Sequence, residues 1–164
     1  MFHKALGFCL IWRFNCAAYF YNKTLYMAKE IWANLPVKNV SKAKEFFSRL
    51  GFSFSTTMDG GEQFACLLVG TNNFHVLLFQ QDIFKTFTQN ALADATAATE
   101  VMFSIDAENR QEVDDMAEKV TAAGGIVFGK PAEFQGWMYG CAFTDLDGHR
   151  WNMLFRDLEK MKGM

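Results

Sequence analysis

From Met27 onward, short apolar runs and amphipathic stretches follow one another in a regular order. Residues 31–37 predict a strand that ends near Pro36, because proline cannot donate to a central ladder. A helix is expected to begin at Asn39 or Ser41 and to end at Gly51, since apolar residues between them recur at helical spacing. Three short strands are then expected at residues 52–57, 64–69 and 74–79, separated by glycine- and asparagine-rich turns.

The second half of the chain repeats this order. Residues 101–105 predict a strand, and Asn109 followed by Glu112 is typical of a helix N-terminus. Gly124 and Gly125 would end that helix, and strands are expected at 126–128, 138–144 and 151–155. The pattern therefore predicts an α+β fold of two tandem βαβββ modules. A short amphipathic helix around Phe84 and an Ala/Thr-rich connector at 93–99 lie between them.

Residues 1–26 differ from the rest, because they hold none of the 18 acidic residues and three of the four tyrosines. A signal peptide matches in part, but Arg13 and Asn15 interrupt the apolar run too early for that or for a membrane-spanning helix. We favour translation beginning at Met27, with 1–26 an upstream extension or a loosely held arm. Residues 27–164 would then form one domain, with modules at about 30–80 and 99–157.

Composition narrows the classes of partner. The net charge is -2 and basic residues are interleaved with acidic ones, which argues against nucleic acid and anionic membranes as partners. The four cysteines, at wide and irregular spacings, form neither a zinc signature nor a disulfide framework. We expect reduced thiols in a cytoplasmic protein, with Cys66 as a buried apolar residue rather than a nucleophile.

Three segments together resemble one known family. Residues 35–40 (LPVKNV) and 46–52 (FFSRLGF) are similar to the first strand and helix of the glyoxalase/bleomycin resistance/dioxygenase proteins, the vicinal oxygen chelate superfamily. Residues 143–152 (FTDLDGHRWN) look like the closing turn and strand of that family. The resemblance covers about residues 30–157. It implies a glyoxalase-related protein with a cupped mixed sheet whose concave face holds the site, often in a homodimer.

In the metal-dependent members of this family, the first and last strands of each module each contribute one ligand. Transferred by position, these places fall at Trp32 and Val76 in the first module and at Glu100 and Asn152 in the second. Only Glu100 is a good ligand for a divalent metal. We therefore expect no metal and no other cofactor. His75 is the alternative ligand, since a one-residue slip would turn it into the cup.

The cup is then expected to bind a small molecule through aromatic and amphipathic side chains. The expected lining is Trp32, Asn34, Glu100, Met102, Trp137, Tyr139 and Asn152. Residues 135–140 form a glycine-flanked aromatic segment that we interpret as a mobile wall, although Trp137 and Tyr139 fit a core equally well. A carboxylate buried in an apolar cup would have a raised pKa, so Glu100 is the candidate general base.

Two functions remain open. The first is a bleomycin-resistance-like protein that binds an amphipathic small molecule in a homodimer, without the full metal site. The second is a glyoxalase-like lyase, isomerase or dioxygenase whose metal site uses His75 or Glu100.

Overall fold

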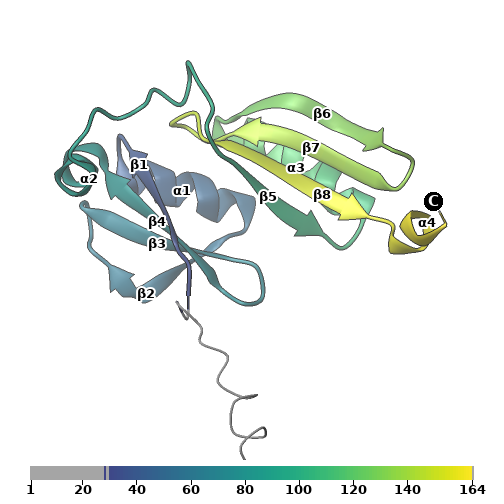
Figure 1. Ribbon diagram of the computed structural model, residues 1–164, viewed down its shortest axis with the longest axis horizontal. Coiled ribbons are helices and arrows are strands. Elements are labelled where there is room, and N and C mark those ends of the chain that lie inside the picture. The colour runs from purple at the N-terminus through teal and green to yellow at the C-terminus, as the bar shows by residue number, and fades with distance from the viewer. Residues whose placement is uncertain (1–27, 29, 164) are drawn as a thin grey trace, which may run out of the picture. The chain divides into compact units, whose positions relative to one another are not determined.

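The structure, a computed structural model that describes residues 28 and 30–163, confirms the two βαβββ modules (Figure 1). The first module comprises β1 (Ala33–Val37), α1 (Val40–Leu50), β2 (Ser53–Asp59), β3 (Phe64–Val69) and β4 (Phe74–Gln80). The second comprises β5 (Met102–Ala107), α3 (Arg110–Ala123), β6 (Ile126–Phe134), β7 (Met138–Thr144) and β8 (Arg150–Arg156). Helix α2 (Gln81–Thr88) follows the first module, and α4 (Leu158–Lys162) follows the second. Residues 1–26, and with them the proposed extension, lie outside the described part of the chain.

Side-chain and glycine caps set the helix ends where the sequence predicted them. The side chain of Asn39 accepts a hydrogen bond from the Lys42 N–H, and α1 begins at the next residue. Asn109 does the same for α3. Gly51 and Gly124 end the two helices at φ of 101° and 93°, in the left-handed region that glycine adopts without strain.

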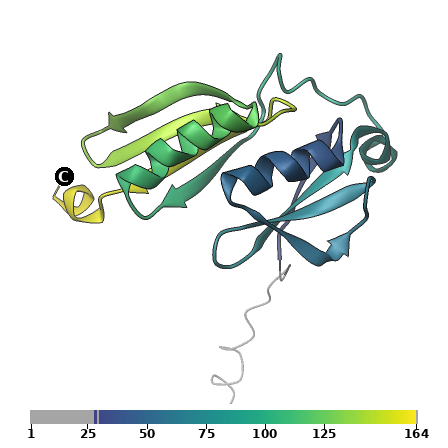
Figure 2. The same cartoon turned by 180° about the vertical axis from the view of Figure 1, so that it is seen from behind.

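Each module forms its own four-stranded mixed sheet. The strand orders are β1-β4-β3-β2 and β5-β8-β7-β6. The first and last strands of each module are parallel, and the other neighbours are antiparallel. Figure 2 shows α1 and α3 each covering one face of its own sheet.

We name the faces turned away from these helices open face A and open face B. Open face A carries Asn34, Pro36, His75, Leu77 and Phe79; open face B carries Met102, Ser104, Asp106, Arg150, Asn152 and Leu154. Residues of opposite parity on these strands, such as Val76 and Trp151, are buried in the core against the helices.

Residues 135–140 do not form the mobile wall predicted for them. Gln135 and Gly136 adopt φ of 51° and 73° in a tight turn, and Met138 already belongs to β7. Strand β6 extends to Phe134, beyond the predicted end at residue 128. The segment is therefore a β-hairpin with a short turn.

The two modules share one hydrophobic core. The ring of Phe47 on α1 contacts Trp151 on β8, with centroids 5.4 Å apart, and Trp151 also stacks on Phe103 at 4.7 Å. Val113 and Val120 of α3 are fully buried in the same cluster. None of the helices among the described residues combines the length and apolar composition that crossing a membrane requires.

The first and last strands of the two modules can be matched residue by residue. Because Asn39 and Asn109 occupy the same cap position, Trp32 corresponds to Met102. Ala33 pairs with Val76, and its counterpart Phe103 pairs with Trp151. It follows that Leu77 corresponds to Asn152.

Candidate functional site

This correspondence corrects two of the four positions taken from the resemblance. Val76 points into the core beneath α1 with 1% of its surface exposed, so Leu77 and not Val76 occupies the position equivalent to Asn152. The alignment was wrong by one residue, which in a strand exchanges the two faces. In the second module Met102, two residues beyond Glu100, is the counterpart of Trp32. The four positions are therefore Trp32, Leu77, Met102 and Asn152.

Open face A brings Trp32 and His75 together. Their rings meet edge to face, with centroids 6.0 Å apart and planes at 68°. Trp32 keeps 49% of its surface exposed, and Asn34 is exposed on the same face. His75 thus lies on the face where the slipped register would have placed it. Cys66 is fully buried and free, and burial raises the pKa of its thiol.

Open face B carries a guanidinium and an amide on one strand. The guanidinium carbon of Arg150 lies 4.3 Å from the centroid of the Phe128 ring, a cation–π contact. Asn152 lies between Ser104 of β5 and Ala142 of β7. Arg150 Nε and Asn152 Oδ1 are buried without a hydrogen-bond partner. A buried polar atom left unpaired costs about 1–3 kcal/mol.

Three of the residues predicted to line the cup lie elsewhere in the structure. The hydroxyl of Tyr139 donates to Asp114 Oδ1 on α3 at 2.8 Å, and the Arg110 guanidinium lies 4.8 Å from the centre of its ring, so Tyr139 faces the helix. The Asp114 hydrogen bond raises the pKa of the phenol. Trp137 is half-buried beside the start of α4, where its carbonyl accepts the Asp157 N–H. Glu100 is exposed before β5, so it lacks the burial on which the general-base hypothesis depended.

The residues at the four positions do not fit a divalent metal. Indole and isobutyl groups offer no donor, the Met102 thioether suits soft ions only, and one amide oxygen remains at Asn152. Within the described residues, no group of three or more His, Cys, Asp and Glu side chains is arranged to hold a metal ion.

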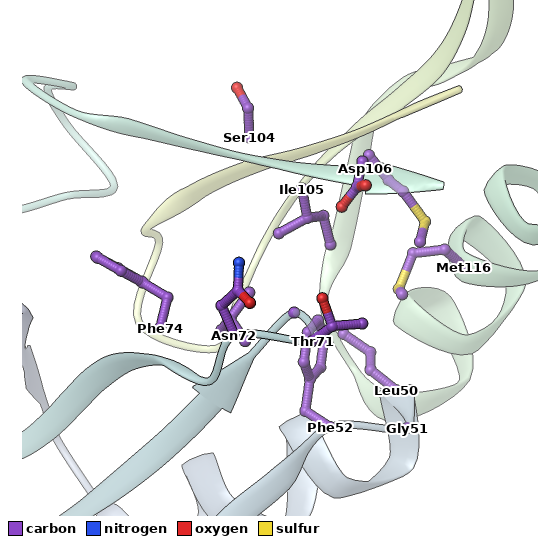
Figure 3. A pocket seen from close by; sticks show the side chains of 13 residues that line it. Leu50, Gly51, Phe52, Thr71, Asn72, Phe74, Ser104, Ile105, Asp106 and Met116 are labelled. Carbon is purple, nitrogen blue, oxygen red and sulfur yellow. The ribbon is translucent and has the colours of Figure 1, made fainter. Parts of the chain in front are cut away.

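Sequence reasoning missed a groove of about 520 Å³, which we call the inter-module groove (Figure 3). The β3–β4 turn (residues 70–73) and the C-terminal end of α1 form one wall; β5, with parts of α3 and β8, forms the other. The lining residues are Leu50, Gly51, Phe52, Val69, Gly70, Thr71, Asn72, Phe74, Ser104, Ile105, Asp106, Met116 and Met153. No motif marks this groove, because its walls come from both modules.

A buried polar network occupies the β7–β8 turn. Asp145, 5% exposed, accepts hydrogen bonds from the His149 ring at 2.9 Å and from the Trp151 indole at 3.4 Å. It also accepts the backbone N–H groups of Asp147 and His149. Burial alone would lower the pKa of the His149 imidazole, but the hydrogen bond and charge of Asp145, with the charge of Asp147, raise it.

Comparisons with known proteins agree with this architecture. Residues 30–153 match the family model described as Glyoxalase/Bleomycin resistance protein/Dioxygenase superfamily. A hypothetical protein from S. aureus is similar in structure, with 33% identity, a TM-score of 0.70, and coverage of 79% of this chain and 95% of that one. A glyoxalase-related enzyme from Fulvimarina pelagi shares the fold at 14% identity and a TM-score of 0.67, covering 79% and 89% of the two chains. A search of curated proteins finds no match.

Proposed function

Because the chain belongs to the glyoxalase/bleomycin resistance protein/dioxygenase superfamily, we propose that it binds a small amphipathic molecule without using a metal. The observation that carries this proposal is the set of side chains at the four positions where metal-dependent relatives place ligands. Trp32, Leu77, Met102 and Asn152 offer stacking area, apolar contact and one amide. Such a mixture of apolar surface and few polar groups is typical of small-molecule sites.

We further propose that two copies pair so that open face A of one meets open face B of the other. Apolar residues at the start of the first strand of each module are exposed: Ile31 by 79% and Val101 by 55%. On open face B, Met102 is 50% exposed and Phe128 47%. Strands β1 and β5 each have an unpaired edge among the described strands, and large exposed apolar patches commonly mark interfaces. Pairing would enclose a ligand between Trp32 and Asn152.

A cytoplasmic location is part of the same proposal. Cys66 and Cys141 are free thiols in the described part of the chain, which supports a reducing compartment.

A metal-dependent lyase, isomerase or dioxygenase is the second candidate, and the position of His75 on open face A favours it. One imidazole beside an indole falls short of the three or more protein ligands that zinc and related metals take. The proposed binding function therefore fits these residues better.

Thermal unfolding with added metal separates the two candidates. Protein freed of metal by chelation is melted alone and with Zn²⁺, Ni²⁺, Mn²⁺ or Fe²⁺ at about a hundredfold excess over a typical Kd. A site confined to the folded state would add about 2.7 kcal/mol and raise the Tm clearly. We expect no such rise. A rise that disappears in His75→Ala, but persists in the control His3→Ala, would establish a metal site on open face A.

A further inference from the structure

We propose that the inter-module groove binds a small organic cation with an apolar body. The groove adjoins open face B through Ser104 and Asp106, but none of Trp32, Leu77, Met102 and Asn152 lines it, so this proposal goes beyond the proposed function. It follows from comparing two junctions that the duplicated fold should make alike, and from the charge of the groove.

The β7–β8 turn closes the first of these junctions. The turn is residues 145–148, and Asp147 Oδ1 accepts the backbone N–H of Lys38 at the end of β1 at 2.9 Å. Leu146 lies against the C-terminal end of α3, where its Cδ2 would be 3.6 Å from a Cβ atom on Gly124. One hydrogen bond therefore joins this turn to module 1, and Leu146 packs against the helix of its own module.

The β3–β4 turn stands at the equivalent place in the other junction and does not close it. The two turns differ in length, since four residues (70–73) separate the paired Val69 and Phe74 and five (145–149) separate the paired Thr144 and Arg150. Counted back from the corresponding residues of β4 and β8, Thr71 takes the place of Leu146. The N–H of Glu108, the counterpart of Lys38, bonds to Glu112 Oε2 at 2.9 Å and so gives nothing to the turn. The groove of about 520 Å³ lies beside this turn, and Gly70, Thr71 and Asn72 line it.

The side chains that line the inter-module groove indicate the charge and polarity of the ligand. Figure 3 shows the side chains of Ile105, Asp106 and Met116 on one side of the groove, with those of Phe52 and Thr71 across from them. Asp106 is the one ionisable side chain in the lining, and no Lys, Arg or His accompanies it. Methionine and aromatic walls adapt to varied apolar shapes. The complementary molecule carries a positive charge for Asp106 and an aromatic or aliphatic body for the floor.

The test uses 3-phenylpropylamine as the probe and its neutral analogue 3-phenylpropan-1-ol as the control ligand. Each is titrated into the ¹⁵N-labelled full chain, and backbone amide shifts report both site and affinity. We expect the amine to shift resonances of residues 50–52, 70–74 and 104–106. It should bind about fivefold more tightly than the alcohol, the scale of one exposed ion pair. Asp106→Asn should remove that preference, whereas Glu118→Gln on the outer surface of α3 should keep it.

A second variant tests the groove itself. Thr71→Leu copies Leu146 of the closed junction and should fill the space, so we expect amine affinity to fall at least about tenfold with the Tm unchanged or higher. The proposal is overturned if the amine shifts none of these resonances or binds no better than the alcohol. Undiminished binding to Thr71→Leu would also overturn it. If the same resonances shift when the protein alone is diluted, a second copy of the chain occupies the groove, and the proposal is overturned.

Discussion

At the scale of single residues, the network around Asp145 makes stability depend on pH. His149 has a raised pKa in the folded chain, against an ordinary value of 6.5. Its contribution to stability is fully present below the unfolded pKa, and it is lost as pH rises through the folded pKa. Burial raises the pKa of Asp147. Carboxyl groups ordinarily titrate at a lower pH than histidine.

We therefore expect the free energy of unfolding to fall as pH rises above about 6.5, because deprotonation of His149 removes its ion pair with Asp145. Urea unfolding across this range measures the effect. His149→Gln should lose the pH dependence, while His75→Gln, on open face A, should retain it. Equal slopes for the unmodified chain and His149→Gln would contradict this account.

Single residues are also where sequence reasoning was weakest. The sequence placed Trp32, Asn34 and Asn152 on the faces where the structure has them. Side chains alternate between the two faces along a strand, and this alternation was clear for these residues. Val76 was misplaced because a run of four apolar residues, 76–79, shows no alternation from which to read its register. Tyr139 was misplaced because only its partner Asp114, distant in sequence, reveals which side it faces.

At the scale of elements, prediction succeeded where local chemistry decides the outcome. Asn39 and Asn109 begin helices and Gly51 and Gly124 end them, as their cap preferences indicate. Strand β6 was predicted to end at residue 128, but it continues through Gly129 and Pro131 to Phe134. The structure accommodates them through irregular pairing with β7.

The contact of α1 with β8 is the element-level feature on which stability should depend most. Phe47 is 1% exposed and its ring meets both Phe52 and Trp151. We expect Phe47→Ala to lower the free energy of unfolding by about 3–5 kcal/mol, the usual cost of emptying a buried phenylalanine site. Chemical denaturation measures this. Lys119→Ala, on the exposed side of α3, should change stability by less than about 0.5 kcal/mol. Similar losses for both variants would contradict the assigned core.

At the scale of the whole molecule, residues 31–164 form one compact unit that contains the entire described core. A chain beginning at Met27 should therefore melt within a few degrees of the full chain and sediment as the proposed dimer. Calorimetry and sedimentation velocity give the two readouts. Loss of folding would show that residues 1–26 belong to the domain, and a folded monomer would contradict the pairing of open faces.

The repeated βαβββ order could be predicted at this scale because the hydrophobic pattern occurs twice. The inter-module groove could not be predicted, because its walls come from both modules. Gly70, Thr71 and Asn72 in one wall look like ordinary turn residues in the sequence.

The central claim, that open face A contributes to a small-molecule site, is tested most directly by fluorescence titration with 8-anilinonaphthalene-1-sulfonate, an amphipathic aromatic probe. The folded protein should bind the probe saturably with quenching of tryptophan emission, because Trp32 would stack on it. Trp32→Ala should weaken binding by about 1–3 kcal/mol without lowering the Tm, since Trp32 is 49% exposed. Trp137→Phe should leave the affinity unchanged. Unaltered binding in Trp32→Ala together with a large loss of stability would show that Trp32 is a structural residue, and would contradict the claim.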